Sequence, residues 1–116
     1  MDFELDGFMD EYLSDLKNAL SGLDNSAILS IISDVEIVID SGNTIHFIGN
    51  GGSAATPSHS AGDWSKELGV ATICHTDNAS GLTAWANDTD YNSIFSRQLE
   101  ALGMPNDILI AISTSG

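Results

Sequence analysis

The chain has 116 residues, with 17 acidic and 3 basic side chains and a formal net charge of −14 at pH 7, so we expect one small acidic domain. A charge this negative repels nucleic acids and anionic lipid headgroups over about a Debye length, which argues against both as partners. Cys74 is the only cysteine, which excludes an internal disulfide and fits a reducing cytoplasm.

We expect no export or membrane signal in the N-terminal part of the chain. Its first residues, MDFELDGFMDEYL, are acidic where a secretory signal has Lys or Arg, and no uninterrupted apolar region follows. The most apolar stretch, AILSIISDVEIVID, is interrupted by Asp34 and Glu36, well short of the roughly 20 apolar residues of a membrane span. We therefore expect a soluble, cytoplasmic protein.

Two amphipathic helices are expected before residue 43. The first has an apolar residue at every third or fourth position, at Met9, Leu13, Leu16, Leu20 and Leu23. The second follows the capping residues Asp24, Asn25 and Ser26 and ends at Gly42, and its apolar residues are Ile28, Ile31, Ile32, Val35, Val38 and Ile39. We predict a helical hairpin over residues 1–42, whose apolar stripe packs either on the rest of the domain or on another subunit.

Short apolar runs then alternate with segments of helical composition. The runs are TIHFI at 44–48, VATICHT at 70–76 and DILIAIS at 107–113, which predict three strands. Strands that alternate with helices favour an α/β fold with a parallel sheet, in which the loops at the carboxyl ends of the strands form the ligand site. These loops contain GNGGS after the first strand, TDNASG after the second and STSG after the third.

The GNGGS loop, residues 49–53, has the composition of an anion site. Its glycines allow positive φ angles that point several N–H groups at one anion, and Ser53 can cap the following helix. The alternatives are an ordinary glycine turn and a dinucleotide loop, since Gly49, Gly51 and Ala54 fit GxGxxA and Asp77 could bind a ribose. STSG offers three hydroxyls at a second anion position, although a polar chain end explains it equally well.

Histidines supply the remaining candidates. His59 and Asp63 are four residues apart on a predicted helix, so they can bind one metal or act as an acid and base pair, or form a local pair on a solvated face. His46, inside a strand, is expected to be buried and hydrogen-bonded, whereas His75 could approach a ligand. Trp64 and Trp85 are interpreted as packing residues.

Together these motifs resemble the sugar isomerase (SIS) domain of the phosphoheptose isomerase family, over about residues 43–116. The resemblance rests on GNGGSA at 49–54, the histidine at 59, AND at 86–88, FSRQLEALG at 95–103 and ISTSG at 112–116. It implies a three-layer αβα, flavodoxin-like SIS fold with a partial parallel sheet in the order 2-1-3, preceded by the hairpin. It also favours a sugar phosphate over a dinucleotide.

The resemblance implies an aldose–ketose isomerase that acts on sedoheptulose 7-phosphate through an enediol, which requires a base and an acid. It implies that substrate contacts come from Asn50, Gly51 and Gly52, phosphate contacts from Ser53, Ser113, Thr114 and Ser115, and contacts to the sugar hydroxyls from Asn87 and Asp88. It further implies that His59 binds zinc and that Asp63, where the family usually has Glu, is both a metal ligand and the catalytic base.

Two departures from the family pattern bear on function. Asp63 is one methylene shorter than Glu, as in related sugar isomerases, which leaves the substrate open. Family members also continue past STSG into a late helix that supplies Gln and His, so we expect an amino-terminal half, from a truncated gene or a deliberately shortened chain. The third strand would then be an open edge that can pair with another chain, and we expect a homo-oligomer, a dimer or a tetramer.

The alternative function is a non-catalytic SIS module that oligomerises and binds a protein partner, as in the replication-initiator-associating proteins.

Overall fold

A computed structural model describes residues 4–116, so residues 1–3 of the predicted hairpin segment lie outside the described residues. The chain divides into two compact units, and the boundary between Ile31 and Ile32 falls inside the second helix. Each unit is considered by itself below. Within the described residues, no helix is long and apolar enough to cross a membrane.

The two predicted helices are present as α1 (Leu5–Ser21) and α2 (Asn25–Ser41). At the start of α2 the Asp24 carboxylate accepts hydrogen bonds from the hydroxyl and the N–H of Ser26, and these bonds lower the pKa of Asp24. After α2, Gly42 takes a positive φ of 71°, as expected of a glycine that ends a helix. The pairing of the two helices as a hairpin stays a prediction.

The second unit contains a parallel sheet of three strands in the order β2-β1-β3, as predicted. The strands are β1 (Thr44–Ile48), β2 (Ala71–Cys74) and β3 (Ile108–Ala111). β2 and β3 are shorter than the predicted runs, because residues at their ends leave the regular ladder. Single hydrogen bonds continue the pairing beyond it, from His75 N to Phe47 O and from Ile112 N to Ile48 O.

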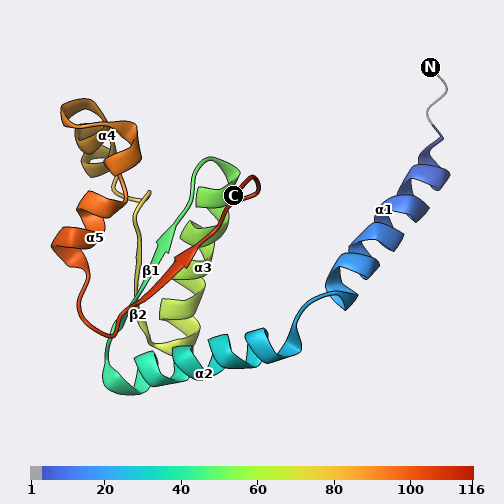
Figure 1. The fold of residues 1–116 in the computed structure, drawn as a ribbon, viewed down its shortest axis with the longest axis horizontal. Coiled ribbons are helices and arrows are strands. Elements are labelled where there is room, and N and C mark those ends of the chain that lie inside the picture. Colours follow the sequence, from blue (N-terminus) through green and yellow to red (C-terminus); the bar gives the residue numbers. More distant parts are fainter. Residues whose placement is uncertain (1–3) are drawn as a thin grey trace. The chain divides into compact units, whose positions relative to one another are not determined.

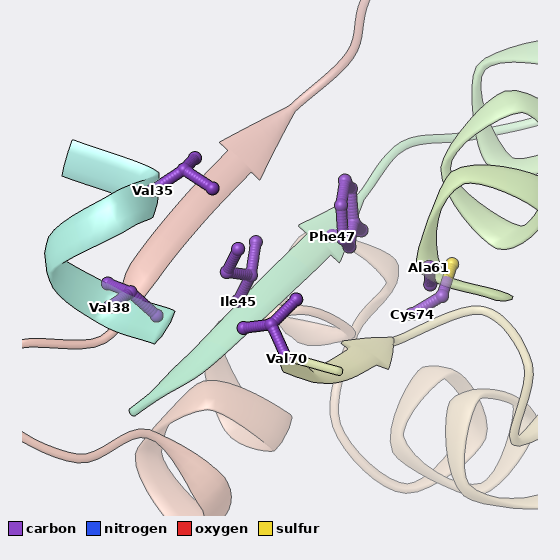
Figure 2. Packing of buried hydrophobic residues seen from close by; sticks show 7 residues of the cluster. All are labelled: Val35, Val38, Ile45, Phe47, Ala61, Val70 and Cys74. Carbon is purple, nitrogen blue, oxygen red and sulfur yellow. The ribbon is translucent and has the colours of Figure 1, made fainter. Parts of the chain in front are cut away.

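The hydrophobic core lies on one face of this sheet (Figure 2). Ile45 and Phe47 of β1 are 0% and 1% exposed and point to the same side, because side chains alternate along a strand. They pack with Val35 and Val38 of α2, Ala61 of α3 (Gly52–Leu68), and Val70 and Cys74 at β2. Trp64 of α3 meets Phe47 edge to face with ring centroids 5.4 Å apart, so its interpretation as a packing residue is confirmed.

On the side of the sheet opposite α3 lie α4 (Ala79–Asp88) and α5 (Ser96–Leu102) (Figure 1), with the short 3-10 helix η1 (Tyr91–Ser93) between them in the chain. They leave part of this face open, since Leu109 of β3, the partner of His46, is 48% exposed. Ile94 and Gln98, which lie just before and within α5, are buried there. Trp85 of α4 is 36% exposed and lies under the Arg97 guanidinium, 5.8 Å from the ring centroid, so it belongs to the surface. Helices on both faces make the three-layer αβα fold that was predicted.

Candidate functional site

The loop after β1 can pass close to its neighbours because it begins with glycine. A Cβ at Gly49 would overlap the carbonyl oxygen of Ser53 and would lie 3.0 Å from that of Ile112. Ser53 O is available at this position because Pro57, four residues further along α3, has no N–H to donate to it. Gly51 then takes a φ of 56°, which turns the chain into α3.

This close approach creates a pocket of about 280 Å³ between the loops that follow β1 and β3. Its lining consists of Ile48, Gly49, Asn50, Ser53, Phe95, Ala111, Ile112, Ser113, Thr114 and Ser115. The two loops meet because β1 and β3 are parallel neighbours, so their carboxyl ends lie at the same edge of the sheet. Five of the predicted site residues, Asn50, Ser53, Ser113, Thr114 and Ser115, are thus brought together.

Hydroxyl groups and a helix terminus dominate the chemistry of this pocket. Four of the lining residues carry hydroxyls, and Ser113 Oγ accepts a hydrogen bond of 2.9 Å from Gly116 N. Ser53 lies in the first turn of the 17-residue α3, where the positive end of the helix dipole favours an anion, while the N–H of Ser53 itself donates to Asn50 O. None of the lining residues is Lys or Arg, so an anion would be held by neutral donors.

Tyr91 is a neighbour of the pocket that the sequence analysis did not identify. Its hydroxyl donates a hydrogen bond of 2.8 Å to Asn50 Oδ1, across 41 residues of sequence. This bond occupies the oxygen of the Asn50 amide and leaves the Nδ2 group to donate to a ligand. Phe95, just before α5, was identified only as part of the FSRQLEALG motif and not as a site residue, and neither residue has a spacing that would have linked it to the GNGGS loop.

His59 and Asp63 form the expected pair on one face of α3. His59 Nε2 lies 3.1 Å from Asp63 Oδ2, and the two side chains are 83% and 57% exposed. Neither residue is among those that line the pocket. Within residues 4–116, no group of three or more His, Cys, Asp or Glu side chains could hold a metal ion. Catalytic zinc usually takes three protein ligands, so the described donors do not make a complete zinc site.

The other predicted contacts lie outside the pocket lining. Asn87 and Asp88 are exposed in the last turn of α4, and Asn87 Nδ2 donates a hydrogen bond of 3.0 Å to Asp88 Oδ1. Gly51 and Gly52 are exposed beside the pocket at the start of α3. Their roles in binding a substrate stay predictions.

Two histidines that the sequence treated differently form one buried network. His46 and His75 are both 1% exposed, and His46 Nδ1 lies 2.9 Å from His75 Nε2. His46 Nε2 lies 2.9 Å from Asp107 Oδ2, and His75 Nδ1 lies 3.3 Å from Gln98 Oε1. The expectation of a buried, hydrogen-bonded His46 is confirmed. The suggestion that His75 approaches a ligand is wrong, because both of its ring nitrogens face protein groups inside the domain.

Titration of this network is set by burial and hydrogen bonds. The N–H of Thr44 and the side-chain amide of Asn43 hold the pKa of the Asp107 carboxyl well below its ordinary range. Burial lowers the pKa of His75, although its hydrogen bond to Gln98 opposes this effect. The carboxylate of Asp107 is therefore ionised and faces a histidine ring.

Comparison with known proteins places these features in a wider context. No protein-family model matches the chain. It is 41% identical over 111 residues to a Thermoplasma acidophilum protein named probable phosphoheptose isomerase, which covers 91% of this chain and 61% of the relative. It is 38% identical to the phosphoheptose isomerase of Akkermansia muciniphila over 122 residues. This alignment covers 93% of this chain and 63% of the relative.

A solved structure is similar as well. Phosphoheptose isomerase GmhA from Neisseria gonorrhoeae matches with a TM-score of 0.85 and 29% sequence identity, over 95% of this chain and 59% of that one. The chain spans about three fifths of the length of the curated relatives that it matches, 61% of the Thermoplasma acidophilum protein and 63% of the Akkermansia muciniphila protein. The predicted resemblance and the fold that it implied are confirmed.

Proposed function

We propose that this chain forms the phosphate-binding part of a sugar-phosphate isomerase of the phosphoheptose isomerase type. The observation that carries the proposal is the pocket in which the GNGGS loop and the STSG loop meet. Relatives that bear the name phosphoheptose isomerase support the same reaction class. The substrate that we propose is sedoheptulose 7-phosphate.

A phosphate group suits the donors of this pocket. It accepts several hydrogen bonds at once, and the hydroxyls of Ser53, Thr114 and Ser115 can supply them beside the positive end of the α3 dipole. In a chain of net charge −14, neutral donors aimed at one point bind an anion that the molecule as a whole repels. The pocket would hold the phosphate end of the substrate and so fix where the sugar lies.

The sugar would extend from the phosphate toward Asn50. Its Nδ2 group can donate to a sugar hydroxyl while Tyr91 holds the amide oxygen. Asn87 and Asp88 are the further contacts that we propose for sugar hydroxyls, since an amide and a carboxylate provide both a donor and acceptors.

Isomerisation through an enediol moves a proton from one carbon to its neighbour. We assign Asp63 as the base that takes this proton and His59, 3.1 Å away, as its acid partner. Both residues would also serve as zinc ligands, and a bound zinc would polarise the substrate oxygens. Because two donors fall short of a complete zinc site, no step of the proposal depends on the metal.

We also propose that the protein is a cytoplasmic homo-oligomer. Cys74 is buried and unpaired, which suits a reducing compartment. α1 carries the predicted apolar stripe on side chains that are about half exposed, from 44% at Leu16 to 59% at Leu20. An apolar stripe of this length is typical of helices that pack on another subunit.

Binding of ligands to the ¹⁵N-labelled chain tests the phosphate site. We expect sedoheptulose 7-phosphate and inorganic phosphate to shift the amide signals of Ser53 and Ser113–Ser115, and unphosphorylated sedoheptulose to leave them in place. Loss of one hydrogen bond to a charged group costs about 1.5–3 kcal/mol, so Ser53→Ala should weaken phosphate binding about tenfold or more.

Ser65→Ala is the matched control, because Ser65 is an exposed serine of the same helix whose hydroxyl donates to Gly62 O. Its affinity for phosphate should equal that of the wild type. Equal losses in the two variants, or shifts that map away from the loops after β1 and β3, would refute the phosphate site.

A further inference from the structure

The buried histidine network, made of His46, His75, Gln98 and Asp107, joins four separate elements. His46 is in β1, His75 follows β2, Gln98 is in α5 and Asp107 precedes β3. All four side chains are buried or nearly so, and each contacts the next within hydrogen-bond distance. None of them lines the pocket, so the proposed function leaves this network without a role.

The orientation of the Gln98 amide fixes one proton of the network. Its Nε2 group donates 2.8 Å to Ile94 O and 3.0 Å to His75 O, and both of these are carbonyl acceptors. Its Oε1 atom therefore faces His75 Nδ1 at 3.3 Å and can only accept. His75 Nδ1 must carry a hydrogen, since a bare nitrogen would oppose the lone pairs of the amide oxygen.

Asp107 fixes a second proton in the same way. Its carboxylate already accepts from Thr44 N, Asn43 Nδ2 and Met104 N, and it is ionised. His46 Nε2, 2.9 Å from Oδ2, must therefore donate to it. The remaining contact, between His46 Nδ1 and His75 Nε2 at 2.9 Å, needs one proton of its own. Three protons thus occupy four ring nitrogens, whereas two neutral histidines carry only two.

We propose that His46 and His75 share one additional proton, and that this buried positive charge, balanced by Asp107, fastens α5 to the sheet. The charge lies mainly on His46, which is next to the carboxylate, and His75 stays neutral with its proton on Nδ1. The network is then neutral overall, which reduces the cost of burying its charges.

Other charged groups near the network do not supply the balance. On α5, Arg97 pairs with Glu100 at 3.2 Å on the exposed side of the helix. At β2, the Cys74 thiol belongs to the core on the opposite face of the sheet and contacts Thr76 Oγ1. Among the described residues, Asp107 is the charged group that directly contacts either ring.

Removal of the shared proton would break the chain of hydrogen bonds at one point. His75 would then donate from Nε2 to His46 and present a bare Nδ1 to Gln98 Oε1. Rotation of the amide would relieve this conflict only by giving up both of its bonds to carbonyls. Because Phe95, three residues before Gln98, lines the pocket, looser attachment of α5 would also loosen the pocket wall.

The proton count can be measured directly in the full chain. Nitrogen NMR of ¹⁵N-histidine-labelled protein at pH 7 reports which ring nitrogens carry protons. We expect two N–H groups on His46 and one, at Nδ1, on His75, and the exposed His59 is an internal reference. Only two N–H groups over the two buried rings would overturn the proposal, whatever their arrangement. This test does not depend on the proposed isomerase activity.

Substitution of the balancing carboxylate gives a second test. Asp107→Asn keeps the shape of the side chain but removes its charge, so His46 should lose one of its two N–H signals at pH 7. Asp34→Asn, which removes an exposed charge from α2, is the matched control and should leave both signals. Retention of both signals in Asp107→Asn would overturn the role of Asp107, and if this variant does not fold, the wild-type spectrum decides.

Discussion

Gly49 lies where the end of β1 passes the start of α3 and the end of β3. A Cβ at this position would overlap the carbonyl oxygen of Ser53 and lie 3.0 Å from that of Ile112, and both of these oxygens belong to the main chain. A side chain at this position would have to push apart the two loops that form the pocket. Residue 49 therefore links the stability of the domain to the shape of the candidate site.

Gly49→Ala is expected to destabilise the domain by roughly 2–3 kcal/mol, the upper part of the range for overpacking, because backbone cannot move aside as a side chain does. Gly62→Ala is the control, since Gly62 lies in the same helix that Gly49 contacts and its added Cβ would meet nothing within 4 Å. Alanine should stabilise that helical position by about 0.5–1 kcal/mol. Urea unfolding measures both, and equal effects would contradict this account of Gly49.

Acid should destabilise the fold through His75 and Asp107. Burial lowers the pKa of His75 below 6.5, so its contribution is complete above about pH 6.5 and is lost as the pH falls through the folded value. The lowered pKa of Asp107 adds a contribution that is present above about pH 3.9 and is lost below it. We expect the urea midpoint to fall as the pH drops from about 6.5 through the folded pKa of His75, and to fall again below about pH 3.9 as Asp107 protonates.

The exposed His59 gives the control for this acid profile. His59→Gln should show the same decline as the wild type, because that side chain is 83% exposed. A wild-type midpoint that stays constant down to pH 5 would argue against a neutral His75 in the folded chain.

At the level of single residues, the sequence could predict burial but not partners. His46 stands between apolar residues of a strand, and this position alone indicated a buried histidine. Its partners His75 and Asp107 are 29 and 61 residues away, and the parallel register brings them together. The hydrogen bond from Tyr91 to Asn50 depends in the same way on how η1 folds back, for which the sequence carries no periodic signal.

At the level of elements, the alternation of apolar runs was sufficient to predict the sheet. Parallel strands joined by helices appear in the sequence as short apolar runs, as at residues 44–48 and 107–113. In the structure β1 is buried on both faces, whereas β3 exposes Leu109 on one face. The meeting of the GNGGS and STSG loops followed from the order of the strands, since β1 and β3 are neighbours. The short η1 could not be predicted, because its three residues make a single 3-10 turn and so show no repeating pattern.

The exposed stripe of α1 should mediate association between chains. Leu16→Glu places a charge in the middle of the stripe, between Leu13 and Leu20, and should raise the dissociation constant of the oligomer at least tenfold. Asn18→Glu adds the same charge on the opposite side of α1 and should have little effect. Sedimentation over a range of concentrations measures both variants. A wild-type chain that is a folded monomer at every concentration would refute the proposed oligomer.

At the level of the whole molecule, charge is the dominant feature. The net charge of −14 on 116 residues makes the chain repel itself, which opposes both folding and association. Sodium chloride shortens the Debye length from about 30 Å at 0.01 M to about 3 Å at 1 M. Tm should therefore rise over this interval, by about 4 °C for each kcal/mol gained. A flat or falling Tm would show that self-repulsion contributes little to stability.

Catalysis tests whether the described residues form a complete active site. His59 and Asp63 provide two donors, and residues 4–116 contain no group of three that could hold a metal. The pair is also 83% and 57% exposed and does not line the pocket, and a poorly placed acid or base loses much of the about 10²- to 10⁴-fold that such groups typically contribute. We therefore expect the 116-residue chain to convert sedoheptulose 7-phosphate no faster than buffer, with zinc or with a chelator.

The His59→Gln variant makes this expectation specific to the proposed pair. If the chain lacks a complete site, wild type and variant should both match the buffer rate, while both still bind phosphate in the pocket of Ser53. Zinc-dependent turnover by the wild type that is lost in His59→Gln would show instead that the pair works with ligands from a second copy of the chain. Turnover that survives this substitution would mean that the base and the acid lie elsewhere, and the pocket between β1 and β3 would then be the place to search for them.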